Sequence, residues 1–369
     1  MLDQDHAVPE GGAEGAAPAS EIVRYRPQFS GRAGEYFGIW IVNVLLTILT
    51  LGIYSAWAKV RTERYFYANT RIAGSSFEYL ADPVRILKGR LIAYAVVIAL
   101  GLSSQFMPVL YLVLLLALFA CMPLIVFLSV RFRARYSAWR GVRFRFVHTA
   151  GGAYGPFLGW PILSSLTGTL LYPLMKRRQH EYLVTGHRFG RAAFGFDSGP
   201  GPYYGPWLIA AGVAIGLFVM LVLGGIVAAA ATAGIADTDE QSAAFVLATT
   251  LAFMVAFYLG VFALTVFLRT RYANLMWNSA RLAGEHRFES TLSAGHVLWL
   301  YLGNLVAILC TLGLATPWAK VRLARYRAQC FELIASGGID GFVAGADADR
   351  GAAGAELSDA LDLGVDIGI

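Results

Sequence analysis

The sequence predicts an all-α membrane protein that crosses a bilayer several times, and three observations lead to this prediction. The chain of 369 residues is 57% hydrophobic and only 15% charged, whereas about a quarter of the residues in a soluble domain are charged. Apolar segments of roughly 20 residues, long enough for the core of a bilayer, recur along the chain. One of these segments is duplicated, together with the basic stretch that follows it.

The duplication is the clearest internal signal. The stretch Asn304–Tyr326 aligns without a gap to Asn43–Tyr65, and both copies contain Thr-Leu-Gly followed by Trp-Ala-Lys-Val-Arg and Arg-Tyr. So many identities in one ungapped register indicate an internal repeat. The second copy has Pro317 where the first has Ala56, which predicts a different bend there.

The remaining apolar pattern divides the chain into one repeat-built membrane domain at 23–335 and two tails. Residues 1–22 have no hydrophobic pattern and are expected to be disordered. The acidic, Gly- and Ala-rich residues 336–369 are expected to be disordered as well. The domain contains about seven apolar helical segments, at 36–57, 91–107, 109–130, 155–175, 206–235, 243–268 and 297–318.

The linkers between these segments also repeat. Each ends a basic run with a Tyr and continues with a Gly and closely spaced Phe residues, as in Phe144-Arg145-Phe146. Alternation at period two around a Gly is typical of a short strand or hairpin. We therefore expect short β-like linkers within an otherwise helical protein.

Membrane topology is left with two alternatives. Four segments, 91–107, 109–130, 206–235 and 243–268, are predicted spans, whereas 36–57, 155–175 and 297–318 either span or are re-entrant. Basic residues concentrate on the cytoplasmic side of a membrane. Seven, six, five and four Lys or Arg occupy the linkers 59–90, 131–154, 176–205 and 269–296. The charge distribution slightly favours the re-entrant alternative for these three segments, because all the basic linkers would then lie on the same side of the membrane.

The repeated motif supplies the candidate functional residues. An indole followed at once by cations is typical of an anchor at the membrane interface. The sharper hypothesis is that the two copies form a paired pocket for an anionic lipid headgroup, since basic clusters at the cytoplasmic face attract such groups. The candidate residues are Trp57, Lys59, Arg61, Arg64, Trp318, Lys320, Arg322 and Arg325.

The sequence offers no support for an enzyme. It contains no nucleotide-binding glycine loop, no HExxH and no nucleophile elbow. His180 and His187 have no ligand spacing and are interpreted as solvated linker residues. We therefore expect no catalytic residue, cofactor or metal. The basic residues lie mostly beside apolar segments, so we expect the lipid bilayer, including anionic lipids, as a partner and no nucleic acid; protein partners and oligomeric state are open.

The same residues carry a resemblance. The stretch 35–70, the KGRL at 88–91, the YGPWL at 204–208 and the WAKVRLARY at 318–326 resemble the YjgN family of bacterial inner-membrane proteins. The resemblance covers roughly residues 25 to 335. It implies a multi-pass protein of the bacterial cytoplasmic (inner) membrane, and it implies no activity, because the family is one of unknown function.

Two functions are compatible with these observations. The first is a non-catalytic membrane scaffold or lipid-interacting protein with basic cytoplasmic linkers, which predicts a dry interior and a basic face. The alternative is a transport or permeation protein with a path between the repeats, which predicts a polar cavity between the two halves. No ionisable residue lies inside any of the seven segments, and this slightly favours the first function.

Overall fold

The computed structural model describes residues 22–234, 240–337, 339 and 342–343. Its helices are joined by an 11-stranded antiparallel sheet, so the predicted all-α class is wrong. The Gly and Phe linkers do form hairpins, as the alternation indicated. An isolated hairpin is only marginally stable and leaves unpaired edges, and the structure resolves this by pairing each hairpin with the next one.

The chain consists of five units, each a pair of helices followed by strands of the sheet. The first comprises α1 (Ala33–Leu49), α2 (Ser55–Ala68), β3 (Thr70–Ile72) and β4 (Ser75–Tyr79). The second comprises α3 (Pro83–Phe106), α4 (Pro108–Arg135), β5 (Ser137–Trp139) and β6 (Val142–Phe146). The third comprises η1 (Gly151–Ala153), η2 (Gly155–Gly159), α5 (Trp160–Leu166), α6 (Tyr172–Gly186), β7 (His187–Phe189) and β8 (Ala192–Phe196).

The last two units follow the same plan. The fourth comprises α7 (Gly201–Gly234), α8 (Glu240–Asn278), β9 (Ala280–Leu282) and β10 (His286–Ser290). The fifth comprises α9 (Ala294–Cys310), α10 (Thr316–Gln329) and β11 (Phe331–Ser336), and the described residues that follow β11 form no further strand. The N-terminal strand β1 (Ile22–Tyr25) supplies the missing partner by pairing with β11.

The sheet curls until its two edges meet. Its strand order is β1-β11-β10-β9-β8-β7-β6-β5-β4-β3-β2, so β1 lies at one edge and β2 (Gln28–Phe29) at the other. Only Arg26 and Pro27 separate β1 from β2 in the chain. One interrupted N-terminal strand therefore bridges the first and the last unit.

The inner face of this curl holds the main core. Side chains from strands far apart in the sheet order join in one cluster: Ile72, Trp139, Val142, Phe189, Leu282 and Leu333. Three residues beyond the sheet, Ile339, Phe342 and Val343, pack against the same cluster. They belong to the C-terminal tail that was predicted to be disordered. The rest of that tail beyond Gly337, and residues 1–21 of the N-terminal tail, lie outside the described residues.

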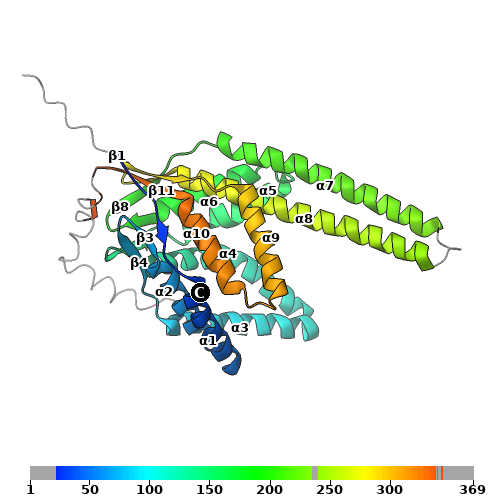
Figure 1. Ribbon diagram of the computed structural model, residues 1–369, viewed down its shortest axis with the longest axis horizontal. Coiled ribbons are helices and arrows are strands. Elements are labelled where there is room, and N and C mark those ends of the chain that lie inside the picture. The colour runs from blue at the N-terminus through cyan, green and yellow to red at the C-terminus, as the bar shows by residue number, and fades with distance from the viewer. Residues whose placement is uncertain (1–21, 235–239, 338, 340–341, 344–369) are drawn as a thin grey trace, which may run out of the picture.

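The helices extend from the sheet as hairpins of two lengths (Figure 1). The four helices α3, α4, α7 and α8 are long and apolar enough to cross a membrane. The segments for which the sequence left two alternatives, 36–57, 155–175 and 297–318, instead form short helical hairpins: α1–α2, α5–α6 and α9–α10. Neighbouring units contact each other around the sheet, and α10 of the last unit packs against α1 of the first.

The repeated Thr-Leu-Gly forms the turn of two short hairpins. Leu51 and Gly52 adopt φ angles of 49° and 93°, and Leu312 and Gly313 adopt 50° and 96°. Glycine reaches such positive φ values without the steric cost that other residues bear. The Gly52 amide donates to the Thr47 carbonyl at 2.8 Å, which ends α1 and reverses the chain. The motif is therefore the reason that these segments turn back.

Candidate functional site

The candidate residues of both copies lie on the second helix of a short hairpin, directly after the turn. Lys59 is the fifth residue of α2, so it lies only ~6 Å along the helix axis from the start of that helix. Leu51 and Leu312, at the tips of the two hairpins, are each 95% exposed. Each hairpin therefore presents an apolar tip followed closely by an indole and then by cations.

In the first copy, the cations face the second unit. Burial, and after it the neighbouring Arg90 guanidinium, lowers the pKa of Lys59. Arg133 of α4 acts in the same direction, whereas Glu63 opposes it. Lys59, Arg90 and Arg133 of α2, α3 and α4 thus lie near one another with one carboxylate, Glu63, and an anion beside them would be stabilised.

Arg61 and Arg64 of the first copy have structural partners. Arg61 donates to Asn43 Oδ1 at 3.4 Å and to the Tyr54 hydroxyl at 3.2 Å. Arg64 Nε donates to the Tyr79 carbonyl at 3.4 Å, just before the second unit's helices begin. Both arginines therefore help to hold the hairpin in place.

In the second copy, the cations face the first unit. Lys320 Nζ donates to the Tyr36 hydroxyl at 3.4 Å and lies 5.9 Å from the centre of its ring. Arg325 donates to the Gly31 carbonyl at 3.4 Å, as Arg64 does to Tyr79. Arg322 lies over the ring of Trp318, 5.0 Å from the ring centre.

The two copies therefore lie against different units of the protein. Lys59 lies beside α3 and α4, whereas Lys320 lies beside α1. The hypothesis that both sets line one shared pocket does not match this arrangement. Pro317 does not bend its helix either, because it lies in the first turn of α10, where the fixed φ of proline suits a helix.

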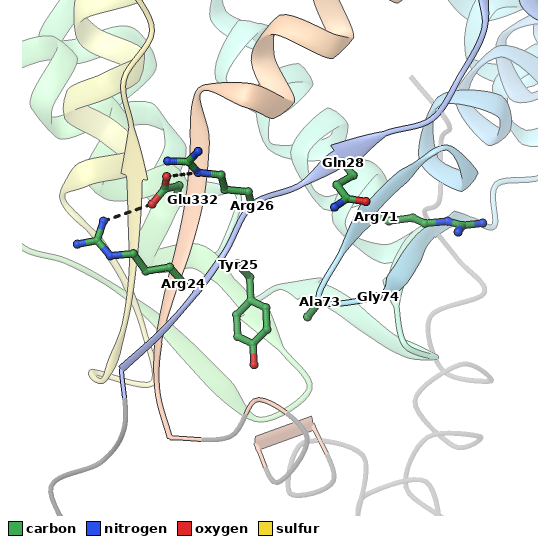
Figure 2. A pocket seen from close by; sticks show the side chains of 8 residues that line it. All are labelled: Arg24, Tyr25, Arg26, Gln28, Arg71, Ala73, Gly74 and Glu332. Atoms are coloured by element: carbon green, nitrogen blue, oxygen red, sulfur yellow. Dashed lines mark hydrogen bonds and ion pairs between the residues drawn. The ribbon is translucent and has the colours of Figure 1, made fainter.

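A cavity of about 770 Å³ opens where the edges of the sheet meet (Figure 2). It is lined by Arg24, Tyr25, Arg26, Gln28, Arg71, Ala73, Gly74 and Glu332. Figure 2 shows Arg24 and Arg26 both turned toward Glu332 on β11. The hydrogen bond from Arg26 lowers the pKa of the Glu332 carboxyl. These ion pairs link the N-terminal strand to β11 and thereby complete the pairing of the fifth unit.

Sequence reasoning missed two groups of residues. The hydroxyl groups of Tyr65 and Tyr326 accept hydrogen bonds from the backbone amides of Arg32 and Ser293, at the start of α1 and α9. In both copies the Tyr lies five residues before the strand that follows the helix, and this spacing can be recognised in the sequence. The second group consists of arginines that alternate with core residues along the strands. These arginines occupy the positions between the Phe residues in the alternating pattern from which the strands were predicted.

The histidines were also misinterpreted. His180 Nδ1 lies 2.9 Å from the Tyr203 hydroxyl, and burial lowers its pKa to about 4. His187 Nδ1 lies 2.6 Å from the Leu183 carbonyl, and burial lowers its pKa as well. Both are packed residues of the third unit and not solvated linker residues.

Comparison with known proteins places the chain in a family. A family model described as "bacterial protein of unknown function (DUF898)" matches residues 24–360. The chain belongs to this family. It is 27% identical over 342 residues to inner membrane protein YjgN of Salmonella typhimurium, across 82% of this chain and 86% of that protein. It is 34% identical over 147 residues to inner membrane protein YjgN of Escherichia coli K12, across 39% and 37% of the two chains. No solved structure matches.

These relatives confirm the resemblance to the YjgN family. Their names, together with the four helices able to span a membrane, establish a multi-pass protein of the bacterial inner membrane. The family description assigns no activity to its members.

Proposed function

We propose that the protein is a non-catalytic scaffold that binds lipid in the cytoplasmic leaflet of the inner membrane. One observation carries the proposal: three short helical hairpins return to the same sheet from which two long hairpins extend. The long hairpins cross the bilayer, and the short ones enter only the leaflet next to the sheet. Four helices then pass through the leaflet far from the sheet, whereas the leaflet next to the sheet also contains the three short hairpins.

The distribution of charge supports the cytoplasmic side for the sheet. All strands join one sheet, so the basic linkers at 59–90, 131–154, 176–205 and 269–296 lie on one side of the helices. Lys and Arg in short linkers favour the cytoplasm. The joint between α3 and α4, at the far end of a long hairpin, contains no charged residue.

The short hairpins are suited to shallow insertion. Amphipathic elements lie with their apolar face about 5–10 Å deep in the boundary between headgroups and acyl chains. An apolar tip at Leu51 and a cation at Lys59 match that depth, with Trp57 between them at the interface. Anionic headgroups then meet Lys59, Arg90 and Arg133, where the first two units face each other.

The transport alternative lacks a comparable observation. It requires a polar path between the repeats, whereas the cavity described above lies at the seam of the sheet. Only 6% of the most apolar stretch of each of α4, α7 and α8 is buried inside the protein. The long helices splay outward from the sheet and are suited to contact with lipid.

The test is the lipid that accompanies the purified protein. Lys59→Ala combined with Arg133→Ala should lower the ratio of anionic to zwitterionic phospholipid, measured by mass spectrometry, by about thirtyfold, since each of the two cations contributes about 1 kcal/mol. Arg71→Ala, an exposed arginine on the sheet, is the matched control. An unchanged ratio would contradict lipid binding at these cations, and release of a trapped dye from proteoliposomes would support transport instead.

A further inference from the structure

The outward face of the sheet carries arginine at alternate positions. Each of five strands has an Arg between inward-facing neighbours: Arg71 in β3, Arg145 in β6, Arg188 in β7, Arg281 in β9 and Arg287 in β10. The neighbours Ile72, Phe189 and Leu282 lie in the core inside the curl. Because successive side chains of a strand point to opposite faces, these arginines point away from the core.

Four of these arginines form a row across five consecutive strands, which we call the arginine row: Arg145, Arg188, Arg281 and Arg287. Arg145 lies directly opposite Arg188, and Arg281 lies directly opposite Arg287. Between the two pairs, β8 presents only Ala193 opposite Arg188 and Gly195 opposite Arg281. With strands ~4.8 Å apart, the row spans about 19 Å across a shallow floor of small residues.

The charge of the arginine row is poorly compensated. Arg145 and Arg287 make no hydrogen bond or ion pair with any described residue. Arg188 donates only to the carbonyls of Thr185 and His187. Two carboxylates lie near the row among the described residues. Asp197 is 3.9 Å from Arg281 and 84% exposed, and Glu289, two residues from Arg287 on β10, pairs with Arg24 instead. Like charges directly opposite each other destabilise a sheet, so the row costs stability unless an anion covers it.

The strands next to the row show what such arginines bind. On β1, Arg24 contacts Glu289 of β10 at 3.4 Å and Glu332 of β11 at 3.3 Å, and Arg26 also pairs with Glu332. There the protein supplies its own carboxylates to outward-facing arginines. Along the row from β6 to β10, such direct pairing is found only between Arg281 and Asp197 among the described residues.

We propose that the arginine row is a docking surface for an acidic segment of a partner protein. An extended peptide laid over Ala193 and Gly195 would place its carboxylates between the two arginine pairs, which suits the fork-like geometry of guanidinium groups. The row offers no aromatic side chain on which a nucleic acid base would stack. Figure 1 shows the strands at the end of the molecule opposite the tips of α7 and α8, where a soluble protein segment can reach them.

The binding test uses the full-length protein in zwitterionic lipid nanodiscs and a fluorescent 15-residue polyglutamate peptide. Binding should weaken with salt, and Arg145→Ala combined with Arg287→Ala should raise the dissociation constant by about tenfold, because an exposed ion pair contributes up to ~1 kcal/mol. Arg71→Ala is the matched control, and a polyglutamine peptide of equal length should not bind. Unchanged polyglutamate binding in the double variant would overturn the proposal, as would tighter binding of a single-stranded DNA of equal charge through the same arginines.

A second measurement separates docking from a structural role. If the row awaits a partner, Arg145→Ala relieves a like-charge pair, and the thermal midpoint of the protein without peptide should be unchanged or higher. Added polyglutamate should raise the midpoint of the wild type and not that of the double variant. A lower midpoint for Arg145→Ala without peptide would show that the arginine holds the sheet together and would overturn the proposal.

Discussion

The two copies of the repeated motif, one on the α1–α2 hairpin and one on the α9–α10 hairpin, share a sequence but not all of their contacts. In both, an Asn of the first helix donates to an Ala carbonyl of the second, at 3.4 Å for Asn43 and 3.5 Å for Asn304. In both, the Tyr hydroxyl accepts from the amide that begins the first helix. The contacts that close each hairpin are thus repeated.

The contacts of the cations differ between the copies. Asn43 Oδ1 accepts from Arg61, whereas Asn304 Oδ1 is buried without a partner and the equivalent Arg322 lies over Trp318. Lys59 faces other cations, whereas Lys320 faces the ring of Tyr36. A repeated sequence therefore fixes the local hairpin, and the neighbouring unit decides what its charged side chains bind.

The largest effect is expected in the third short hairpin, which lacks the motif and buries His180 instead. Because burial lowers the pKa of His180 to about 4, the unfolded chain binds a proton first as the pH falls. The stability linked to the buried, neutral His180 is fully present above about pH 6.5. Up to about 3 kcal/mol of the free energy of unfolding is lost as the pH falls toward 4. Thermal unfolding between pH 7 and pH 4 measures this loss. His180→Gln should flatten the curve, and an equally steep curve in that variant would exclude His180 as its source.

The next effect separates the two asparagines. Asn43→Leu removes the partner of both Arg61 and the Ala58 carbonyl and should lower the free energy of unfolding by about 1–3 kcal/mol. Asn304→Leu also removes a buried oxygen that has no partner, so its cost should be smaller. Equal losses in chemical denaturation would mean that the two copies are energetically the same.

A smaller effect is expected at the two tyrosines. Tyr326→Phe removes the hydrogen bond from the Ser293 amide at 3.0 Å and should lower the free energy of unfolding by about 1 kcal/mol. Tyr65→Phe removes the equivalent bond from the Arg32 amide at 2.8 Å and also the bonds that the hydroxyl donates to the Arg32 carbonyl and to Glu35, so its loss should be larger. Tyr67→Phe, on the same helix as Tyr65 and bonded to Ser137 at 3.1 Å, is the control for loss of a hydroxyl group elsewhere. A larger loss in Tyr326→Phe than in Tyr65→Phe would contradict this order.

The smallest effect is a shift of the thermal midpoint, and its direction should differ between substitutions of the two lysines. Lys59→Ala removes a cation that lies beside Arg90 and Arg133, so the thermal midpoint should stay the same or rise. Lys320→Ala loses a hydrogen bond and a cation–π contact with Tyr36 and should lower the midpoint slightly. Midpoints that move in the same direction would contradict the assignment of the two lysines to different environments.

Local patterns predicted the apolar segments, the repeat and the hairpins, because each depends on neighbouring residues. They could not predict the sheet, since its pairing joins residues far apart in the chain, such as Phe77 with Trp139 and Phe144 with Phe189. The group of cations around Lys59 was predicted only in part, because some of its members come from distant parts of the chain. Lys59 was visible beside Trp57, but Arg133 reaches it only through the packing of the second unit.

The Tyr pattern shows the limit of sequence alignment. All five basic runs end in Tyr, and four of these tyrosines bond to the backbone at the start of their own unit's first helical segment: Tyr65, Tyr182, Tyr272 and Tyr326. Tyr65 and Tyr326 accept from a backbone amide, whereas Tyr272 donates to the Tyr203 carbonyl at 3.2 Å. The same Tyr position therefore serves short and long hairpins through different backbone groups.

The central claim, that the whole sheet lies on the cytoplasmic side and the short hairpins do not cross, is tested most directly by cysteine labelling. After Cys121, Cys310 and Cys330 are replaced by Ser, single cysteines are introduced as Arg191→Cys and Glu285→Cys, in two turns of the sheet, and as Gln105→Cys, at the far end of α3. Intact spheroplasts are then treated with a membrane-impermeant thiol reagent. The account predicts labelling of Gln105→Cys alone until the cells are opened. Labelling of Arg191→Cys from outside, with Glu285→Cys protected, would show that the third unit crosses the membrane and would contradict the account.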